Sequence, residues 1–524
     1  MRSPRRFPLS WPLTLLLALI TMAAPAGCIF RGVTVSPITN RDTATVQTPV
    51  KAHLLDGETV VFEHGVRVAH DTAFGRGLRY ELAVPAVAGG DSVAAIPLDS
   101  VAAMESFVGH TNEGKSVVVS TLATVGAVGA AGLLAVALFG SCPTIYSDSA
   151  GTVALEAEGF SYSISPLLER RDLHRLRAQP DAGGMLSLEV RNEALETHYI
   201  NQLELLGVTH SRSEYVLPDA ANRPLVVRDI IPVAHASDRA GNDVTATLSS
   251  GDTVAFHSDP GTVSNVTAAD LDDWIDIDIP VPANRDSVAL LFDMRNSLLN
   301  TVLFYDEMLR PQGARAVDFE AHDLNDISRM MEIGRWYGSR MGMHIAVRTR
   351  SGWKAVAYIP DSGPIAWQQI AAVIPVIQGD TLHVRLSFVA DQWRIRTVRV
   401  ATAYRHPHAA RLPIASVITA RSVADSVALS GVRTLDGHYL ATSPGQRFTV
   451  RFATGPAPHD STRTFLLATE GYYTEWIRGS WIRQAVGPRP FVPSDSTLAL
   501  AVHRWTQVQP EFERRFATSR IPVR

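Results

Sequence analysis

Two uninterrupted apolar stretches in the first third of the sequence constrain this chain more than any other feature. One runs from Pro12 to Gly27, directly before Cys28, and the other runs from Val117 to Phe139, shortly before Cys142. The second holds no charged residue, and as a helix its 23 residues would extend over ~34 Å, enough to cross a bilayer. Together the two stretches predict that the chain is located at a membrane.

The first stretch has the parts of a secretion signal. Three arginines among the first six residues precede an apolar core at 13–20, which is short for a membrane-spanning helix. The run at 25–28 resembles a bacterial lipobox, in which the cysteine becomes lipidated, although Pro25 stands where an aliphatic residue is usual. We therefore expect residues 1–28 to be a lipoprotein-type signal peptide with the lipid on Cys28. An ordinary signal peptide and an uncleaved anchor are the alternatives.

The second stretch carries a face of small residues. Gly126, Gly129 and Gly132 recur at every third position, with alanines between them. Such a face lets another helix approach closely within a membrane. We expect residues 117–140 to form a transmembrane helix that packs against a partner helix through these glycines. Because glycine is a poor helix former, a buried core helix and a membrane-inserted hairpin are the alternatives.

The charges around the two stretches give conflicting orientations. Lys115 precedes the second stretch, and no Lys or Arg follows until Arg170, which favours its N-terminal end on the cytoplasmic side. A signal ending at Cys28 would already have exported residues 29–115, so the two segments prefer the same orientation. We expect the region after Cys142 to lie outside the cytoplasm, in the cell envelope.

Length and composition allow a large folded core. The chain has 524 residues, of which 46% are hydrophobic, and it contains only two cysteines. If Cys28 carries lipid, no disulfide framework exists and the core itself must stabilise the fold. The net charge of -4 argues against a nucleic acid partner, so we expect the membrane and a protein or a glycan as partners.

Short alternating segments separated by turn residues dominate the sequence and predict a mainly β protein built from antiparallel β-sandwich domains. The expected order is a linker at 29–45, a small β module at 46–110, the apolar helix, a β-rich domain at 141–290, a β-sandwich with a helical insertion at 291–412 and a C-terminal β domain at 413–524. Apolar spacing within the insertion predicts helices over Arg295–Leu309 and Leu324–Tyr337.

One tetrad, Asp-Ser-Val-Ala, begins at Asp91, Asp99, Asp286 and Asp425. The spacing is irregular and the flanking sequences differ, so the tetrad does not indicate an internal repeat. Asp and Ser are typical of turns, and the β-branched valine is typical of strands. We expect each copy to end a turn and to begin a strand.

Several phrases resemble a family of uncharacterised bacterial cell-envelope proteins. They are Ser141-Cys142-Pro143-Thr144-Ile145-Tyr146, Arg170-Arg171-Asp172-Leu173, Arg295-Asn296-Ser297-Leu298-Leu299, Gly363-Pro364-Ile365-Ala366-Trp367, Leu386-Ser387-Phe388-Val389-Ala390-Asp391 and Gly471-Tyr472-Tyr473-Thr474-Glu475-Trp476. The resemblance covers about residues 141–481. It implies a shared fold and carries no known activity.

Two groups of residues are candidates for metal binding. Five aspartates crowd around Trp274, at positions 270, 272, 273, 276 and 278, and carboxylates are calcium ligands. The glycine and terminal glutamate of an EF-hand are missing, and the alternation also fits the solvated face of a strand, which we favour. His406 and His408 form a close pair without an evident third ligand. We therefore expect no metal site and no cofactor.

Catalytic motifs are absent from the sequence. It contains no Gly-x-Ser-x-Gly elbow, no Walker loop, no Gly-x-Gly-x-x-Gly and no His-Glu-x-x-His. Glu470 and Glu475 are the candidates for a glycosidase-type carboxylate pair, because such pairs meet only in space. We expect no catalytic residues.

Tyr472, Tyr473 and Trp476 form an aromatic cluster and are the candidate ligand-binding residues. Their flat faces and polar edges suit sugar rings or a protein interface, while the alternative is the core of the last sandwich. The sequence thus predicts a non-enzymatic cell-envelope lipoprotein with a structural or binding role. A carbohydrate-binding or carbohydrate-active envelope protein is one alternative. A membrane-assembly component that uses the glycine face is the other.

Overall fold

The computed structural model of the chain describes residues 31–37, 43–47, 50–54, 59–62, 64–80, 92–111, 142–149, 152–251, 254–280, 285–377, 381–419, 422–455, 461–477, 481 and 489–518. The predicted signal peptide with Cys28 lies outside these residues, as does the predicted apolar helix with Gly126, Gly129 and Gly132. Among the helices that the structure describes, none is long and apolar enough to span a bilayer.

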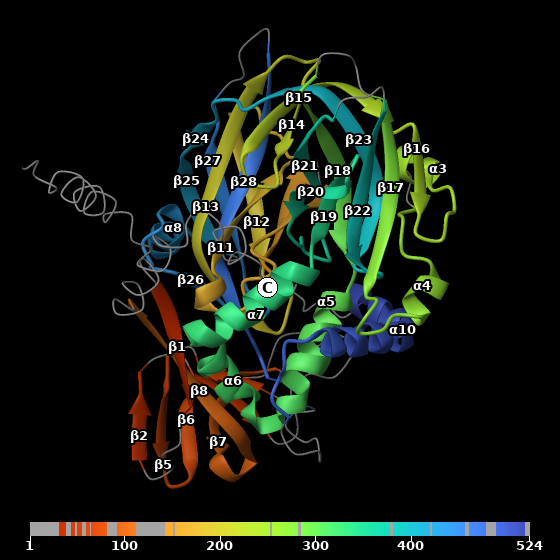
Figure 1. Cartoon of the computed structure of the whole chain (residues 1–524). Coiled ribbons are helices and arrows are strands. Elements are labelled where there is room, and N and C mark those ends of the chain that lie inside the picture. The colour runs from red at the N-terminus through yellow and green to blue at the C-terminus, as the bar shows by residue number, and fades with distance from the viewer. Residues whose placement is uncertain are drawn as a thin grey trace, which may run out of the picture.

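The N-terminal module is an eight-stranded antiparallel sheet, here sheet A, at the lower left of Figure 1. Its order is β1-β8-β3-β4-β6-β5-β2, and β7 pairs with β6. The strands are β1 (Arg31–Pro37), β2 (Thr43–Val46), β3 (Val50–Leu54), β4 (Thr59–Phe62), β5 (Val66–Ala69), β6 (Thr72–Tyr80), β7 (Ser92–Pro97) and β8 (Val101–Thr111), with a 3-10 turn η2 (Leu98–Ser100) before β8. The predicted linker at 29–45 therefore contains strands of this sheet, because β1 pairs along its whole length with β8.

Sheets B and C form the first sandwich, and their inner faces bury one apolar core. Sheet B has the order β10 (Thr152–Glu158), β9 (Thr144–Ser149), β12 (Met185–Arg191), β27 (Arg447–Ala453) and β25 (Ile414–Thr419). Sheet C has the order β11 (Arg170–Arg175), β28 (Thr462–Glu475), β13 (Glu196–His210) and β24 (Ala410–Leu412), and β26 (Leu440–Thr442) also pairs with β13.

Sheets D and E form the second sandwich. Sheet D has the order β14 (Tyr215–Pro218), β15 (Pro224–Pro232), β23 (Trp393–Arg405), β18 (Ser287–Asn296) and β21 (Gln368–Pro375). Sheet E has the order β16 (His235–Asp238), β17 (Asp272–Pro280), β22 (Thr381–Val389), β19 (Met343–Thr349) and β20 (Gly352–Ile359). Alternate residues of each strand face the other sheet, such as Ile275 and Ile277 of β17 and Leu290 and Phe292 of β18.

The second sandwich is inserted into the first. Strands from residues 144–210 and from residues 410–475 build sheets B and C, and the intervening chain builds sheets D and E. The strands therefore cross the domain boundaries expected from the sequence. The expected boundary at residue 290 lies inside β18, and β27 of the expected C-terminal domain pairs with β12. Alternation identifies a strand but does not specify its partner, so the pattern alone does not reveal this insertion.

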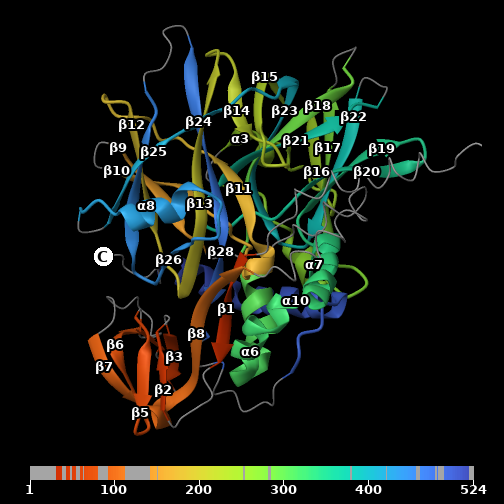
Figure 2. The same cartoon turned by 90° about the vertical axis from the view of Figure 1, so that its left-hand side faces the viewer.

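Helices cover the end of the sandwiches that faces the N-terminal module (Figures 1 and 2). The helical insertion follows β18 and consists of α5 (Leu299–Val302), η4 (Leu303–Leu309), η5 (Arg310–Arg315), α6 (Ala316–Ala321), η6 (Asp323–Asn325) and α7 (Ile327–Arg340). The remaining helical segments are η3 (Pro166–Leu168), α3 (Thr245–Ser250), α4 (Pro260–Ser264), α8 (Ser426–Arg433) and α10 (Asp495–Thr518). The helical insertion was expected, but its first helix begins later than predicted because β18 continues to Asn296.

Two helices differ from the prediction: α8 replaces a predicted strand, and α10 lies in the predicted C-terminal β domain. The fourth Asp-Ser-Val-Ala copy begins α8, because the Asp425 carboxylate accepts hydrogen bonds from the backbone N–H groups of Val427 and Ala428 at 3.0 and 2.9 Å. Aspartate favours helix N-caps as well as turns, so the tetrad is ambiguous. In the expected C-terminal β domain, α10 buries Leu498, Val502 and other residues at helical spacing.

Lys51 of β3 lies buried where the N-terminal module meets the first sandwich. Only 1% of its surface is exposed. Its ammonium group donates a hydrogen bond of 3.4 Å to the carbonyl oxygen of Glu475 and lies 5.5 Å from the ring centroid of Trp476. Val61 and Leu195 pack against the same indole. Lys51 therefore stabilises the contact between the module and the end of β28.

Replacing Lys51 with alanine should loosen this junction. The variant loses a buried hydrogen bond, a cation–π contact and side-chain packing, together worth about 1–3 kcal/mol. We expect backbone amides in β3 and at the end of β28 to exchange hydrogen about tenfold faster or more, measured by mass spectrometry. Arg67→Ala, an exposed change in β5, is the control and should leave this exchange unchanged. Equal exchange in Lys51→Ala and the wild type would contradict the assignment.

Candidate functional site

The predicted aromatic cluster belongs to the protein core. Tyr472, Tyr473 and Trp476 are 0%, 1% and 1% exposed. The ring of Tyr472 stacks on Tyr199 with a centroid distance of 4.8 Å, and the Trp476 indole N–H donates to the Thr197 hydroxyl at 3.0 Å. These side chains cannot offer a face to a ligand, so the ligand-binding interpretation is corrected to the core alternative.

One member of the predicted carboxylate pair is also buried, whereas the other, Glu470, is partly exposed. Glu475 is only 2% exposed and accepts a hydrogen bond from the Tyr305 hydroxyl. Glu470 lies on the same strand, opposite Arg171 of β11. A carboxylate as buried as Glu475 cannot approach a polysaccharide chain, so this pair does not form a glycosidase site of the usual kind.

A buried polar network lies between the two sandwiches and is centred on Asp361. Its carboxylate accepts hydrogen bonds from the Tyr337 hydroxyl at 2.5 Å, the Asn296 amide at 2.8 Å and the Gln392 amide at 2.6 Å. Burial raises the pKa of Asp361 to about 6, although these three hydrogen bonds oppose the shift. Arg170 of β11 donates to the backbone oxygen of Asp361 at 3.2 Å and links the network to the first sandwich.

Glu158 and Cys142 extend this network. The Glu158 carboxylate accepts the backbone N–H groups of Ile365 and Ala366 at 2.8 and 3.0 Å, and the Cys142 thiol donates to it at 3.3 Å. A Cβ atom at Gly363 would lie 2.0 Å from the Glu158 carboxyl carbon, so only glycine fits there. Burial raises the pKa of both the Glu158 carboxyl and the Cys142 thiol, and a buried neutral thiol is a poor nucleophile.

Four of the segments that carry the family resemblance meet in this network. They contribute Cys142, Arg170, Asn296 and the backbone from Gly363 to Ala366. In the sequence these segments are separate short motifs, and nothing in them predicts that they converge. Their convergence has a structural explanation, because a buried polar network requires several matched partners at once.

The aspartates around Trp274 divide between the two faces of β17. Asp273 is buried, whereas Asp276 and Asp278 lie on the outer face opposite Arg385 and His383. Within the described ranges, no group of three or more His, Cys, Asp or Glu side chains is arranged to hold a metal ion. His406 follows the end of β23, with its Nδ1 atom 3.2 Å from the carbonyl oxygen of Pro224.

The outer face of sheet E carries a row in which arginine and tryptophan alternate. The guanidinium of Arg385 lies 4.5 Å from the ring centroid of Trp274 and 4.6 Å from that of Trp353. Arg239 lies 4.7 Å from Trp274 at one end, and Arg348 lies 5.5 Å from Trp353 at the other. We call these five residues the Trp–Arg row. Both indoles remain partly exposed.

Ion pairs fix two arginines of the row. Asp276 accepts two hydrogen bonds of 2.7 Å from Arg385, and Asp270 accepts two of 2.9 and 2.6 Å from Arg239. The small side chain of Ala346 lies opposite Arg385 in the register and gives the guanidinium room to reach Trp353 across β19. The result is a surface of aromatic rings and paired charges with little freedom to move.

Comparisons with known proteins do not identify a family. No family model matches the chain, and no curated protein matches it. Solved structures with some similarity include the C-terminal CBM6 of LamC, a marine laminarinase from Zobellia galactanivorans, at 7% identity and a TM-score of 0.14, covering 38% of this chain and 98% of that one. Another is a GH31 alpha-xylosidase from Xanthomonas citri, at 8% identity and a TM-score of 0.14, covering 83% of this chain and 38% of that one.

A third is the triple jelly roll of a turret assembly in an archaeal virus, at 9% identity and a TM-score of 0.12, covering 65% of this chain and 91% of that one. At such TM-scores the likenesses carry no argument about function. The function must therefore be inferred from the side chains of this chain.

The Asp361 carboxylate should make stability depend on pH. Its pKa rises from 3.8 to about 6 on folding, so between these values the folded protein binds more protons than the unfolded chain. This contribution raises the free energy of unfolding as the pH falls from 7 to 4, by about 2 kcal/mol. Asp361→Asn removes the titration.

We therefore expect the stability of the wild type relative to Asp361→Asn to increase over this pH range, measured by urea denaturation at each pH. The comparison with the variant cancels the other carboxylates, which titrate in both proteins. A difference that stays constant between pH 7 and pH 4 would contradict the role given to this carboxylate.

Proposed function

We propose that the protein is a non-enzymatic lipoprotein of the cell envelope that binds neutral glycans on the outer face of sheet E. The observation that carries this proposal is the Trp–Arg row, in which Arg385 lies between Trp274 and Trp353. Aromatic and arginine side chains are the residues that contribute most to binding surfaces.

The chemistry of the row favours a sugar over a charged ligand. Indole rings offer apolar contact to the C–H groups of a sugar, and the neighbouring guanidinium and carboxylate groups offer hydrogen bonds to its hydroxyls. The charges of Arg385 and Arg239 are already balanced by Asp276 and Asp270. A polar surface whose central charges are paired suits an uncharged ligand.

Rigidity also supports binding at the row. The two arginines are each held by a bidentate ion pair, and strand pairing fixes the backbone beneath them. A surface that is ordered before the ligand arrives loses less side-chain freedom on binding. A ligand can therefore bind the row without rearrangement of these arginine side chains.

The proposal also includes attachment of the chain to a membrane. A lipid on Cys28 would hold the chain at a membrane, and the apolar stretch at 117–139 would provide a second membrane contact, with Gly126, Gly129 and Gly132 available to a partner helix. Two attachments are enough for stable anchoring, whereas a single lipid chain is often reversible.

Removing one indole tests glycan binding. Trp353→Ala should lower the affinity about tenfold or more, because it removes an aromatic anchor at the centre of the surface. The measurement is affinity electrophoresis in gels that contain neutral polysaccharides.

Trp367→Ala is the matched control for Trp353→Ala. Trp367 also contacts an arginine, Arg396, with 4.0 Å between guanidinium and ring centroid, but it lies just before β21 of sheet D. Unchanged binding in Trp353→Ala, or an equal loss in Trp367→Ala, would overturn the proposed site.

Lipidation is tested separately at Cys28. Wild-type protein expressed with a labelled fatty acid should carry the label, and Cys28→Ala should not, because Cys28 follows the lipobox-like sequence of the N-terminal signal. Cys142→Ala is the control and should keep the label. A label that persists in Cys28→Ala would show that the anchor has been assigned to the wrong residue.

A further inference from the structure

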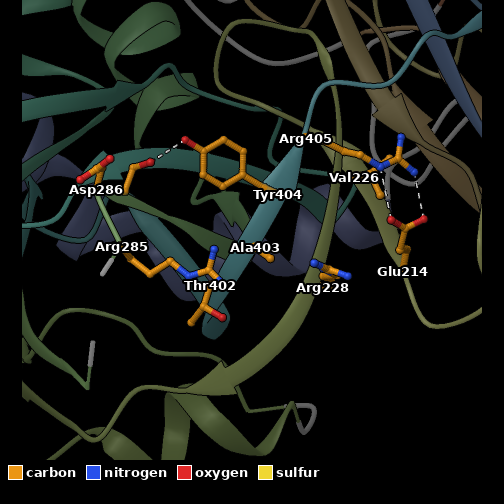
Figure 3. A pocket seen from close by; sticks show the side chains of 10 residues that line it. Glu214, Val226, Arg228, Arg285, Asp286, Thr402, Ala403, Tyr404 and Arg405 are labelled. Atoms are coloured by element: carbon orange, nitrogen blue, oxygen red, sulfur yellow. Dashed lines mark hydrogen bonds and ion pairs between the residues drawn. The ribbon is translucent and has the colours of Figure 1, made fainter. Parts of the chain in front are cut away.

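An open pocket lies on sheet D, away from the Trp–Arg row, and is shown in Figure 3. Its volume is about 640 Å³, within the range of small-molecule sites. It is lined by Val226 and Arg228 of β15, by residues 402–405 of β23, by residues 285–287 at the start of β18 and by Glu214 just before β14. Because β15, β23 and β18 are neighbours in one sheet, the backbone around the pocket is fixed.

Three arginines line this pocket, and they differ in how they are paired. Arg405 is held by Glu214 through hydrogen bonds of 3.3 and 2.9 Å. Arg228 has only Asp229 as an ion-pair partner among the described residues, at 3.8 Å, and both side chains are largely exposed. Arg285 makes no hydrogen bond or ion pair with any residue that the structure describes. Two guanidinium groups therefore retain free donors in one concave surface.

The remaining lining is rich in hydroxyl groups. The hydroxyls of Tyr404 and Ser287 lie 2.7 Å apart and share a hydrogen bond, which leaves each of them a further site for a ligand. Thr402 lies on β23, between the strands that carry Arg228 and Ser287, and its hydroxyl donates a hydrogen bond of 3.4 Å to the carbonyl oxygen of Asp229, which leaves its oxygen free to accept one. In Figure 3 Asp286 lies on the opposite side of the view from Arg228, whereas Glu214 lies beside Arg405, with which it pairs.

We propose that this pocket binds a polar small molecule that bears an oxyanion, such as a sugar carboxylate or a sugar phosphate. A planar guanidinium can donate two hydrogen bonds to the two oxygens of a carboxylate or phosphate, so Arg285 and Arg228 bind the anion. The hydroxyls of Tyr404, Ser287 and Thr402 form hydrogen bonds with the hydroxyls of the ligand. This site is independent of the glycan surface on sheet E, which lacks unpaired charge at its centre.

Glucuronate and glucose 6-phosphate are the probes, with glucose as the neutral comparison. We expect the full chain to bind one or both anionic sugars, measured by isothermal titration calorimetry, and glucose at least tenfold more weakly. Binding of glucuronate alone identifies a carboxylate site, and binding of glucose 6-phosphate alone identifies a phosphate site. Both results support the proposal. Failure of both anions to bind, or equal binding of glucose, overturns it.

Substitutions locate the binding. Arg285→Ala should weaken the binding of the anionic sugar tenfold or more, and Arg285→Lys should weaken it less, because lysine keeps the charge but loses the planar fork. Arg399→Ala removes an exposed arginine of β23 outside the pocket lining and should have no effect. An equal loss in Arg399→Ala and Arg285→Ala would show general attraction to positive charge and would overturn the site.

Two further controls test whether the binding is lost through unfolding and whether it depends on sheet E. Arg285 is exposed, so Arg285→Ala should melt at the wild-type temperature, which excludes loss of binding through unfolding. Trp353→Ala should retain the binding of the anionic sugar, because Trp353 lies on sheet E. Loss of that binding in Trp353→Ala would overturn the independence of the two sites.

Discussion

The pairing of β13 with β28 is the constraint on which the rest of the structure depends. These strands run antiparallel from Glu196 opposite Glu475 to His210 opposite Thr462, and the whole second sandwich lies between them in sequence. Closing so long a loop costs little more entropy than closing a shorter one, so an insertion of this size is tolerated. The second sandwich begins soon after β13 and ends just before β24, which pairs with the same strand, and Lys51 attaches the N-terminal module to the end of β28.

Polar contacts then set how the two sandwiches meet. Glu158 of the first sandwich accepts backbone N–H groups from the segment that precedes β21 of the second, and Asp361 of that segment accepts donors from three further side chains. Buried acceptors are stable only with their partners in place, which favours one arrangement over others. The fixed arrangement leaves the outer face of sheet E and the pocket on sheet D available, and these are the two surfaces to which we assign binding.

Sequence patterns predicted the kind of elements better than their partners. The alternation of Ile275 and Ile277 with Asp276 correctly placed a strand with one wet face, since side-chain direction follows directly from the period of a strand. The same pattern does not reveal that Arg385 lies opposite Asp276, because register across strands is set by tertiary structure. The sequence therefore does not reveal the Trp–Arg row, whereas the aromatic run around Tyr472 is evident in it, although strands with large aromatic residues are common in cores.

Contact between a glycan and the two indoles of sheet E defines the proposed binding surface. The most direct measurement is 19F NMR of protein labelled with 5-fluorotryptophan, which gives each tryptophan of the mature chain its own resonance. On titration with a neutral polysaccharide fragment, the account predicts that the resonances of Trp274 and Trp353 shift while those of the buried Trp393, Trp476 and Trp505 stay in place. Shifts confined to other tryptophans, or no shift at Trp274 and Trp353 under conditions where the glycan binds, would contradict it.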